Sequence, residues 1–400
     1  TDPVWWHWVS VVVPDGKLPE TGMLFISGGS RNSQMPTEAD EQVLQIALHS
    51  QSVVAKLHNA PNQPLVFKND DYGPRTEDEL IAYGWRKFLE AGGGDENAHW
   101  LARLPMTKSA VRALDVITDL TMKHEDMTTV TKFVVAGASK RGWTTWTTGA
   151  VDKRVVAIAP IVIDLLNLVP SFHHHWQAYG RWADAIHDYE DEGIMEWQGS
   201  KEYDDLGRLS DPYSYLPDLK LPKLILNATG DQFFLPDSWQ FYWEDLQGES
   251  LLRYVPNTDH GMRNSDALES LVAFHQMVIN DHERPRFDWK VDNGITTIKT
   301  GDIKPASIKL WTAHNPNARN FQLKEVGEAF TPQEIAIRDD GQYTIEVETP
   351  SQGWSAYFVE LTYPGVGQIP LKLTTGTVVL PDKYPYPPFQ SKDPRGTFEN

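Results

Sequence analysis

The sequence predicts an α/β fold, a mostly parallel sheet flanked by helices, followed by a β-sandwich domain. Two observations indicate this division. Up to about residue 284, short apolar runs alternate with segments of helical periodicity, as in parallel sheets covered on both faces. Beyond Pro285 the periodicity becomes alternating, and short strands recur at regular spacing. We therefore expect an α/β domain over residues 1–284, a β-sandwich over 285–382 and an extended tail over 383–400.

Each predicted element of the first domain has a local signal in the sequence. The predicted strands are short apolar runs: Val9–Val13, Met23–Ile26, Ser52–Leu57, Phe133–Ala136, Val155–Ile158, Lys223–Ala228 and Leu251–Val255. The predicted helices carry apolar residues three or four positions apart: Leu80–Leu89, Val111–Leu120, Trp239–Leu246 and Leu268–Val278. Thr76–Glu79 is a capping signal for the first of these helices.

Residues from about 165 to 220 break this alternation and are rich in Trp, Tyr, His, Asp and Glu. We interpret them as an inserted cap or excursion, which either lines a substrate cleft or packs onto the body of the domain. The packing alternative rests on large side chains at helical spacing: Trp176, Tyr179, Trp182, Ile186 and Tyr189.

The predicted β-sandwich has strand patterns separated by turn residues such as Asp339-Asp340-Gly341. Its predicted strands are Ser307–Trp311, Glu334–Arg338, Tyr343–Val347, Trp354–Leu361 and Leu371–Leu373.

The composition limits the class of protein. Its 400 residues, 40% of them hydrophobic, suffice for two packed domains. The net charge of −19 argues against nucleic acid or an anionic membrane surface as a partner. Cysteine is absent, which excludes disulfides and thiolate metal sites, and no apolar run is long enough to predict a membrane span. The chain opens at Thr1 without a signal peptide, so we expect a trimmed or mature form.

The most specific motif is Gly137-Ala138-Ser139, which follows a predicted strand and precedes a segment that can be helical. This is the layout of a nucleophile elbow, in which a serine on a tight strand-to-helix turn exposes its hydroxyl. Glycines flank such a turn because side chains there would clash. The usual second glycine stands two residues after the serine, whereas here Arg141 takes that place and Gly142 comes third. Ser139 is therefore the candidate nucleophile.

An acid and a histidine follow this serine in the chain order of an α/β-hydrolase fold. Asp231 lies just past the predicted strand Lys223–Ala228, and His260 lies in a glycine-containing loop before the last predicted helix of the domain. A serine hydroxyl needs a base to become a nucleophile, and that base needs a carboxylate to orient it. We assign His260 as the base and Asp231 as the acid, with Asp237 as the alternative acid farther from the strand end.

Backbone N–H groups that would stabilise an oxyanion can also be placed from the sequence. The amide of Lys140 follows the serine, and Gly28 and Gly29 follow an early strand, as in the glycine-rich oxyanion loop of esterases. For Gly28 and Gly29 a tight turn is an equally good interpretation. Arg141 either binds a substrate carboxylate or, as we favour, forms a structural ion pair.

We predict no metal and no cofactor. The run His173-His174-His175 resembles a metal-binding cluster, but three consecutive residues of regular secondary structure cannot converge on one ion. No spaced His or Glu pattern completes a ligand set.

Taken together, these motifs resemble the PhoPQ-activated pathogenicity-related protein family. The resemblance extends over nearly the whole chain and rests on seven segments: Trp6-His7-Trp8, Glu77–Leu80, Leu104–Lys108, Gly137–Trp143, Pro160–Leu166, Thr229–Asp237 and Pro256–His260. It implies an α/β-hydrolase-like catalytic domain, related in style to the prolyl-oligopeptidase-type hydrolases. It also implies an exported protein, periplasmic or secreted, because members of the family are typically exported.

The sequence thus predicts a serine hydrolase that cleaves an amide or ester through an acyl-enzyme. A peptide substrate is favoured on the resemblance to peptidase-type hydrolases and, weakly, on the acidic charge. A carbohydrate-linked or small-molecule ester is the alternative substrate. The rival from another class is a non-catalytic binding or signalling protein that keeps the hydrolase fold, because a fold does not determine a function.

Overall fold

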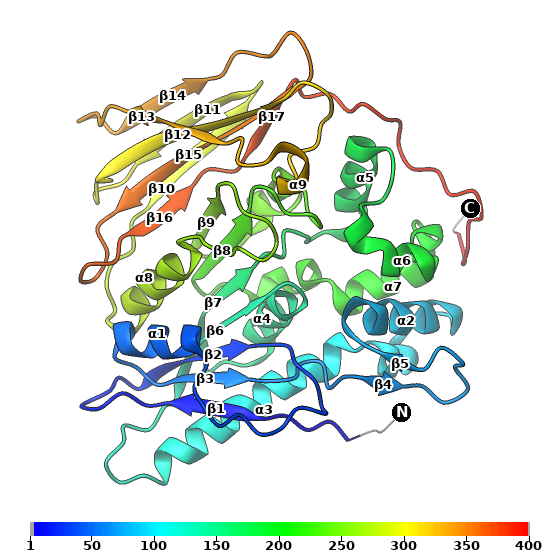
Figure 1. Cartoon of the computed structure of the whole chain (residues 1–400), viewed down its shortest axis with the longest axis vertical. Coiled ribbons are helices and arrows are strands. Elements are labelled where there is room, and N and C mark those ends of the chain that lie inside the picture. Colours follow the sequence, from blue (N-terminus) through cyan, green and yellow to red (C-terminus); the bar gives the residue numbers. More distant parts are fainter. Residues whose placement is uncertain (1–3, 399–400) are drawn as a thin grey trace.

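A computed structural model describes residues 4–398 of the chain and places a sheet flanked by helices beneath a layer of antiparallel strands (Figure 1). The first part is built on seven strands in the order β1-β3-β2-β6-β7-β8-β9. Their bounds are β1 Val9–Val12, β2 Thr21–Ile26, β3 Val54–Leu57, β6 Lys132–Ala138, β7 Val155–Ile161, β8 Lys223–Ala228 and β9 Ser250–Val255. β1 pairs antiparallel with β3, and every other pair in this sheet is parallel. All seven predicted strands are confirmed, and the fold is an α/β-hydrolase fold.

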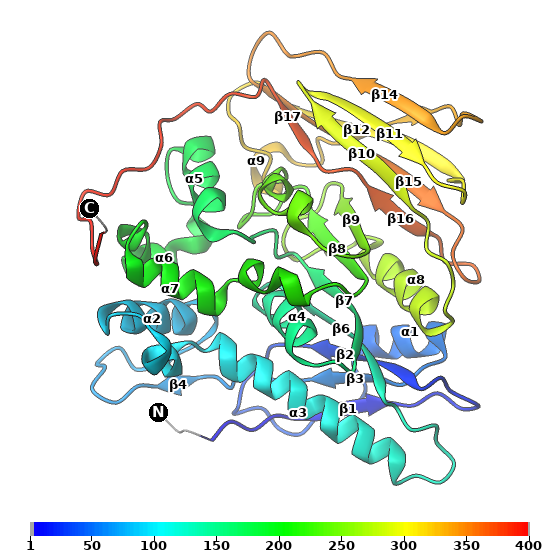
Figure 2. The same cartoon turned by 180° about the vertical axis from the view of Figure 1, so that it is seen from behind.

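Helices cover both faces of this sheet. α1 (Glu41–Ser50) packs against α8 (Ala267–Ile279) on one face, and α3 (Arg103–Met122) packs against α4 (Lys140–Val151) on the other (Figure 2). β6 and β8 are buried along almost their entire length because they lie between these layers, which explains why their sequences are continuous apolar runs. α2 (Glu77–Glu90) begins after Thr76, whose backbone N–H donates to the Glu79 carboxylate at 3.2 Å.

Two local predictions for this part need correction. α1 was not predicted from its pattern, although Asp40 caps it by accepting from the N–H groups of Gln42 and Val43. The helix predicted over Trp239–Leu246 is wrong, because this stretch forms two short 3₁₀ turns interrupted at Tyr242. Here a tertiary contact overrides the periodicity: the Trp239 indole packs against Trp289 and donates to the Thr377 carbonyl at 2.8 Å.

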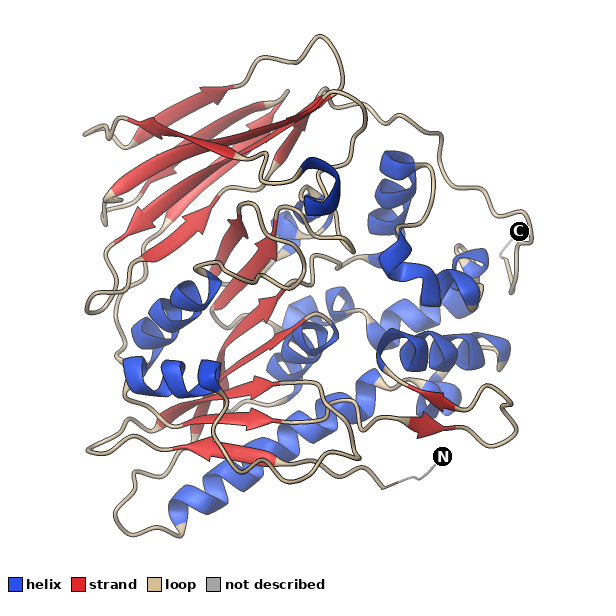
Figure 3. Cartoon of the chain, viewed as in Figure 1, coloured by secondary structure: helices blue, strands red, loops and turns tan. Residues whose placement is uncertain are grey.

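The insertion near residues 165–220 forms a separate helical layer at one end of the sheet (Figure 3). Its α-helices are α5 (Leu168–Tyr179), α6 (His187–Asp191) and α7 (Lys201–Ser210), joined by 3₁₀ turns. The large side chains from Trp176 to Tyr189 do not share one helix, because Gly180, with φ of 67°, caps the end of α5. Trp182, Ile186 and Tyr189 are nevertheless buried, as the packing alternative expects.

The C-terminal part consists of a three-stranded sheet, β10-β11-β14, and a five-stranded sheet in which β13, β12, β15 and β16 follow in order and β17 pairs with β15. Their bounds are β10 Phe287–Asp292, β11 Ile295–Thr300, β12 Ser307–Asn315, β13 Thr331–Ile335, β14 Gln342–Glu346, β15 Trp354–Tyr363, β16 Leu371–Thr374 and β17 Val378–Leu380. The hairpin β10–β11 was not predicted, although Asn293-Gly294, with φ of 50° and 75°, is a favourable two-residue turn.

The segment after β17 runs away from the β-sheets and across the insertion (Figure 1). Tyr384 hydrogen-bonds His174 of α5 at 2.7 Å, and the Phe389 ring packs on Trp176 and Trp182. This tail therefore connects the β-rich part to the insertion. No helix within residues 4–398 has the length and apolar character needed to cross a membrane.

Candidate active site

Ser139 stands at the sharp turn between β6 and α4, with φ of 57° and ψ of −127°. This conformation is rare for a residue with a side chain and is typical of a strained functional position. The turn is held by two backbone hydrogen bonds: the Ser139 N–H donates to Ile161 at 2.8 Å, and the Trp143 N–H donates to the Ser139 carbonyl at 3.1 Å. Within the described residues the Ser139 side chain has no hydrogen-bond partner.

The two glycines around Ser139 are explained by close backbone approaches. A Cβ on Gly137 would lie 2.8 Å from the Arg141 carbonyl oxygen, and one on Gly142 would lie 2.9 Å from the Ile161 carbonyl oxygen. The displaced second glycine of the motif is therefore the point at which α4 passes directly over β7. The second glycine is therefore needed at position 142, and position 141 is occupied by the large side chain of Arg141.

His260 and Asp231 lie together, as predicted, on the loops after β9 and β8. The Nδ1 atom of His260 is 2.8 Å from Oδ2 of Asp231, and because a carboxylate only accepts, Nδ1 carries the proton. Oδ1 of Asp231 accepts from the Phe233 N–H at 2.7 Å, which orients the carboxylate. The Nε2 atom of His260 is buried and has no partner among the described residues. A buried ring nitrogen without a partner indicates a functional role, because most buried polar atoms are paired.

Asp237, the alternative acid, is engaged elsewhere. Its carboxylate contacts His174 Nε2 at 2.9 Å and forms an ion pair with Arg319 of the β-rich part. Burial favours the neutral acid, but Arg319 and His174 outweigh it and hold the pKa of Asp237 well below its usual value. The neighbouring His175 accepts a hydrogen bond from the Ala183 N–H at 3.0 Å, and burial lowers its pKa to about 3. These histidines are thus structural contacts of α5.

The two basic residues after Ser139 form ion pairs with the start of α2. Arg141 makes a bidentate pair with Glu77, both contacts at 2.7 Å, so the structural interpretation of Arg141 is confirmed. Lys140, with a side chain only 7% exposed, contacts Glu77 and Asp78, each at 2.9 Å. Burial alone would raise the pKa of Glu77, but Arg141 and Lys140 hold it well below its usual value.

Gly28 and Gly29 follow β2 and lie next to the elbow helix. A Cβ on Gly28 would come within 2.4 Å of the Arg141 guanidinium, so a side chain there would displace Arg141 from its present position. The Gly28 carbonyl accepts from the Asn59 N–H at 2.8 Å. Among the described residues neither the Gly28 nor the Gly29 N–H has a partner, which leaves both donors available.

A cavity of about 30 Å³ lies directly beside Ser139. Lys140, Asp78 and Arg103 contribute to its wall, and most of the remaining lining is aromatic or aliphatic. Phe233 and Phe234 line it as well, and their rings pack on His260 with centroids 4.4 and 6.0 Å apart. The cavity is therefore continuous with the side chains that surround the Asp231–His260 pair.

A larger cavity of about 660 Å³ lies elsewhere, between the N-terminal segment and α3, and its lining includes none of the candidate triad. It contains a Ser–His contact, Ser109 Oγ to His7 Nε2 at 2.8 Å. There the other imidazole nitrogen of His7 contacts the backbone carbonyl of His58 at 3.1 Å and not a carboxylate. Ser109 lies within a regular helix, and its hydroxyl donates a hydrogen bond to the Pro105 carbonyl. The Ser109 hydroxyl is thus already hydrogen-bonded, whereas that of Ser139 has no partner among the described residues.

The β-rich part braces both loops that carry the Asp–His pair, which the sequence did not predict. The side chain of Asn257 exchanges two hydrogen bonds of 2.9 Å with the backbone of Phe330. The Leu323 N–H donates to the Gly230 carbonyl at 2.9 Å, directly before Asp231. The only sequence signal for these contacts with the β-rich part was the presence of Asn257 and Gly230 at loop positions. Within residues 4–398 no three His, Asp or Glu side chains are grouped so that they could hold a metal ion.

Comparison with known proteins places these features in a family. A family model described as PhoPQ-activated pathogenicity-related protein matches residues 1–322. The chain is 36% identical to autocrine proliferation repressor protein A of Dictyostelium discoideum over 414 residues, which cover 96% of this chain and 82% of that protein. Neither the family description nor the name of this relative states a reaction.

Two solved structures, one of an esterase and one of a peptidase, align with this chain. An acetyl xylan esterase from Paenibacillus sp. R4 aligns with a TM-score of 0.45 at 14% identity, over 63% of this chain and 73% of that chain. The acylaminoacyl peptidase of Pyrococcus horikoshii aligns with a TM-score of 0.45 at 14% identity, over 70% of this chain and 42% of that chain.

Proposed function

This chain belongs to the PhoPQ-activated pathogenicity-related protein family, and from the geometry of its site we propose that it is a serine hydrolase. In this proposal Ser139 is the nucleophile, His260 the general base and Asp231 the orienting acid. The reaction is cleavage of an ester or amide through an acyl-enzyme. One observation carries the proposal: a serine in an elbow conformation occurs in one fold with a carboxylate-bound histidine whose buried Nε2 has no partner.

The proposed reaction has two halves. His260 Nε2 takes the proton of the Ser139 hydroxyl as Oγ attacks the substrate carbonyl, and the resulting oxyanion accepts from the Lys140 N–H, with Gly28 or Gly29 as second donor. Collapse expels the leaving group, which receives the proton from His260. Water then attacks the acyl-enzyme with His260 again as base, releasing the acid and restoring Ser139. Asp231 keeps the proton on Nδ1 throughout.

Fluorophosphonate labelling read by intact mass tests this proposal, because the probe reacts only with an activated serine. We expect one adduct on the wild type and none on Ser139→Ala, with labelling greatly slowed in His260→Ala. Asp231→Asn should lower the labelling rate by on the order of 10⁴-fold, since the amide favours the wrong tautomer. Ser214→Ala and His187→Ala, which alter exposed residues outside the site, are matched controls.

Two results would refute the proposal. One is a folded wild type that forms no adduct, and the other is a Ser139→Ala variant that is still labelled. A loss of labelling in Asp237→Asn with full labelling in Asp231→Asn would transfer the role of the acid to Asp237.

An exported location, periplasmic or secreted, is part of the same proposal and is supported by the family resemblance alone. Fractionation of the native organism with an antibody against the chain tests it, and recovery in the cytoplasmic fraction would refute it.

A further inference from the structure

We propose that the cavity beside Ser139 is an acyl pocket that accepts a short, uncharged acyl group of acetyl or propionyl size. This inference rests on the proposed hydrolase function and names the substrate class of the same site: esters or amides of short-chain carboxylic acids. Three properties of the cavity carry it, namely its size, the rigidity of its walls and its enclosure.

The size of the cavity sets the length of the acyl chain. Its volume is about 30 Å³, and about 10–15 Å³ holds one water-sized group, so there is room for one or two carbon atoms beyond the carbonyl. Large buried side chains form most of the wall: Trp85, Trp143, Phe172, Ile186, Tyr189 and Phe234. A longer chain would have to displace these groups.

The walls cannot move apart cheaply because they are tied together by polar contacts. The Trp143 indole N–H donates to the Ser210 carbonyl at 2.5 Å, which joins α4 to the insertion. The Tyr189 hydroxyl donates to Asp78 at 3.0 Å, and Asp78 contacts Lys140 at 2.9 Å. Contacts between side chains therefore connect the insertion to Lys140, the first residue after Ser139.

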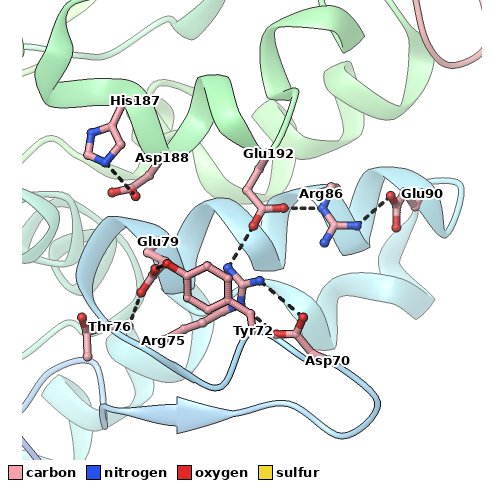
Figure 4. Close-up of polar contacts among 10 residues, drawn as sticks. All are labelled: Asp70, Tyr72, Arg75, Thr76, Glu79, Arg86, Glu90, His187, Asp188 and Glu192. Atoms are coloured by element: carbon pink, nitrogen blue, oxygen red, sulfur yellow. Dashed lines mark hydrogen bonds and ion pairs between the residues drawn. The ribbon is translucent and has the colours of Figure 1, made fainter.

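A second set of ion pairs fastens the insertion to α2 on the outer side (Figure 4). Glu192, just after α6, accepts from Arg75 at 3.0 Å and also pairs with Arg86. Arg75 is held in turn by Asp70 at 2.9 Å, and its side chain is only 5% exposed. Moving α6 to enlarge the pocket would break these buried pairs together with the Tyr189 contact.

The enclosure decides which half of the substrate lies inside. The acyl group stays bonded to Ser139 through the acyl-enzyme, whereas the leaving group must depart before water enters. A space of about 30 Å³ holds a short acyl group that stays attached to Ser139 but is too small for a larger leaving group, so the acyl group occupies it. Most of the lining is aromatic or aliphatic, and Asp78 on the wall pairs with Lys140. The Arg103 guanidinium donates to the Lys140 carbonyl at 2.9 Å and lies over the Trp143 ring, 4.3 Å from its centroid. The pocket therefore fits an uncharged acyl group.

The test compares p-nitrophenyl acetate, butyrate and octanoate as substrates of the full chain, with Ser139→Ala rates subtracted as background. We expect kcat/KM for acetate to exceed that for butyrate at least about 10-fold, because butyrate carries one methylene more than the largest acyl group that fits, and a misfitting methylene costs about 10-fold or more. Ile186→Ala, which removes three carbons from the wall, should raise the butyrate-to-acetate ratio at least about 10-fold. Ile194→Ala is the matched control, because Ile194 is equally buried in the same insertion but does not line the cavity.

The outcomes separate this inference from the function on which it rests. Equal rates for octanoate and acetate in the wild type would overturn the pocket while leaving the hydrolase intact. An unchanged butyrate-to-acetate ratio in Ile186→Ala would also overturn it. If that variant does not fold, Ile186→Val, which removes one carbon from the wall, is compared on butyrate and acetate and decides the same point. Absence of both a fluorophosphonate adduct and any ester hydrolysis would instead refute the hydrolase function itself.

Discussion

At Ser139 a residue with a side chain adopts a positive φ that costs on the order of 1–3 kcal/mol. The conformation persists because β7 and α4 fix the turn through backbone hydrogen bonds on both sides of the serine. The hydroxyl does not cap its own helix, and no hydrogen bond within the described residues engages it. This single residue therefore links a backbone constraint to the proposed chemistry.

Asp164, at the end of the strand that follows the elbow, is a second unusual residue. It is 3% exposed and accepts hydrogen bonds from the hydroxyls of Tyr242, at 2.6 Å, and Tyr254. Burial raises its pKa to about 8 although the two tyrosines oppose the shift. The folded protein therefore binds this proton more tightly than the unfolded chain, in which the pKa is near 3.9. The stabilisation is complete below about pH 4 and is lost as the pH rises toward 8.

The variant Asp164→Asn should remove this pH dependence, because the amide mimics the protonated acid at every pH. Relative to the wild type, its free energy of unfolding should rise with pH by up to about 1.4 kcal/mol per unit between pH 5 and 8. Urea denaturation at pH 5, 6.5 and 8 measures the difference, with the exposed Asp15→Asn as control. Parallel pH profiles for Asp164→Asn and the wild type would contradict the assignment.

At the scale of elements, the loops after β8 and β9 carry Asp231 and His260 but are not held by their own sheet alone. Asn257 lies three residues before His260 and has φ of 56°. Its side chain makes two hydrogen bonds with the backbone of Phe330. The His260 N–H donates to Gln232 at 3.1 Å, which joins the two loops. The distance between acid and base thus depends on a segment of the β-rich part.

The variant Asn257→Gly should therefore slow fluorophosphonate labelling about 10-fold and lower the free energy of unfolding by about 1–3 kcal/mol. Glycine keeps the positive φ, so the loss reports the two hydrogen bonds and not backbone strain. Asn264→Gly is the control, since Asn264 also has φ of 56° but is exposed and lacks a side-chain hydrogen bond within residues 4–398. Equal labelling rates for the two variants would show that the brace does not position His260.

For the molecule as a whole, the C-terminal segment connects the β-rich part to the insertion. Tyr384 reaches His174, Phe389 packs on two tryptophans of the insertion, and Thr397 donates its N–H to Glu202 at 2.8 Å. The insertion is thus held from both sides, by this tail and by the ion pairs of α2 in Figure 4. Rigidity of the pocket wall is a property of the complete chain.

We expect Phe389→Ala to increase amide hydrogen exchange across α5, α6 and α7 without changing exchange in the β-rich sheets. The half-buried ring contributes about 1–2 kcal/mol of apolar contact to the insertion. Phe398→Ala, in the same tail but 46% exposed, serves as the matched control. Unchanged exchange in the insertion would show that the tail only lies on its surface.

Strongly periodic or motif-bearing segments were predicted well, because their local signals agree with their tertiary surroundings. The elbow at Ser139 and the strands β6 and β8 belong to this group. The predictions that failed depend on contacts between distant residues: Gly180 ends α5 where the periodicity continues, and the Trp239 indole anchors 3₁₀ turns against Trp289. Asp237 was an alternative acid by sequence position, and only the structure shows that its carboxylate is engaged by His174 and Arg319 instead of His260.

The sequence by itself determined the α/β-hydrolase order of elements and the identity of the three candidate catalytic residues, because strand periodicity, turn glycines and chain order are local properties. Only the tertiary structure decided which acid meets His260, what Arg141 pairs with, and how small the space beside Ser139 is. Those features arise from side chains that lie far apart in the sequence, 111 positions in the case of Asp78 and Tyr189 beside the cavity. No local pattern encodes such a distance, because it is set by how the sheet, the insertion and the β-rich part pack.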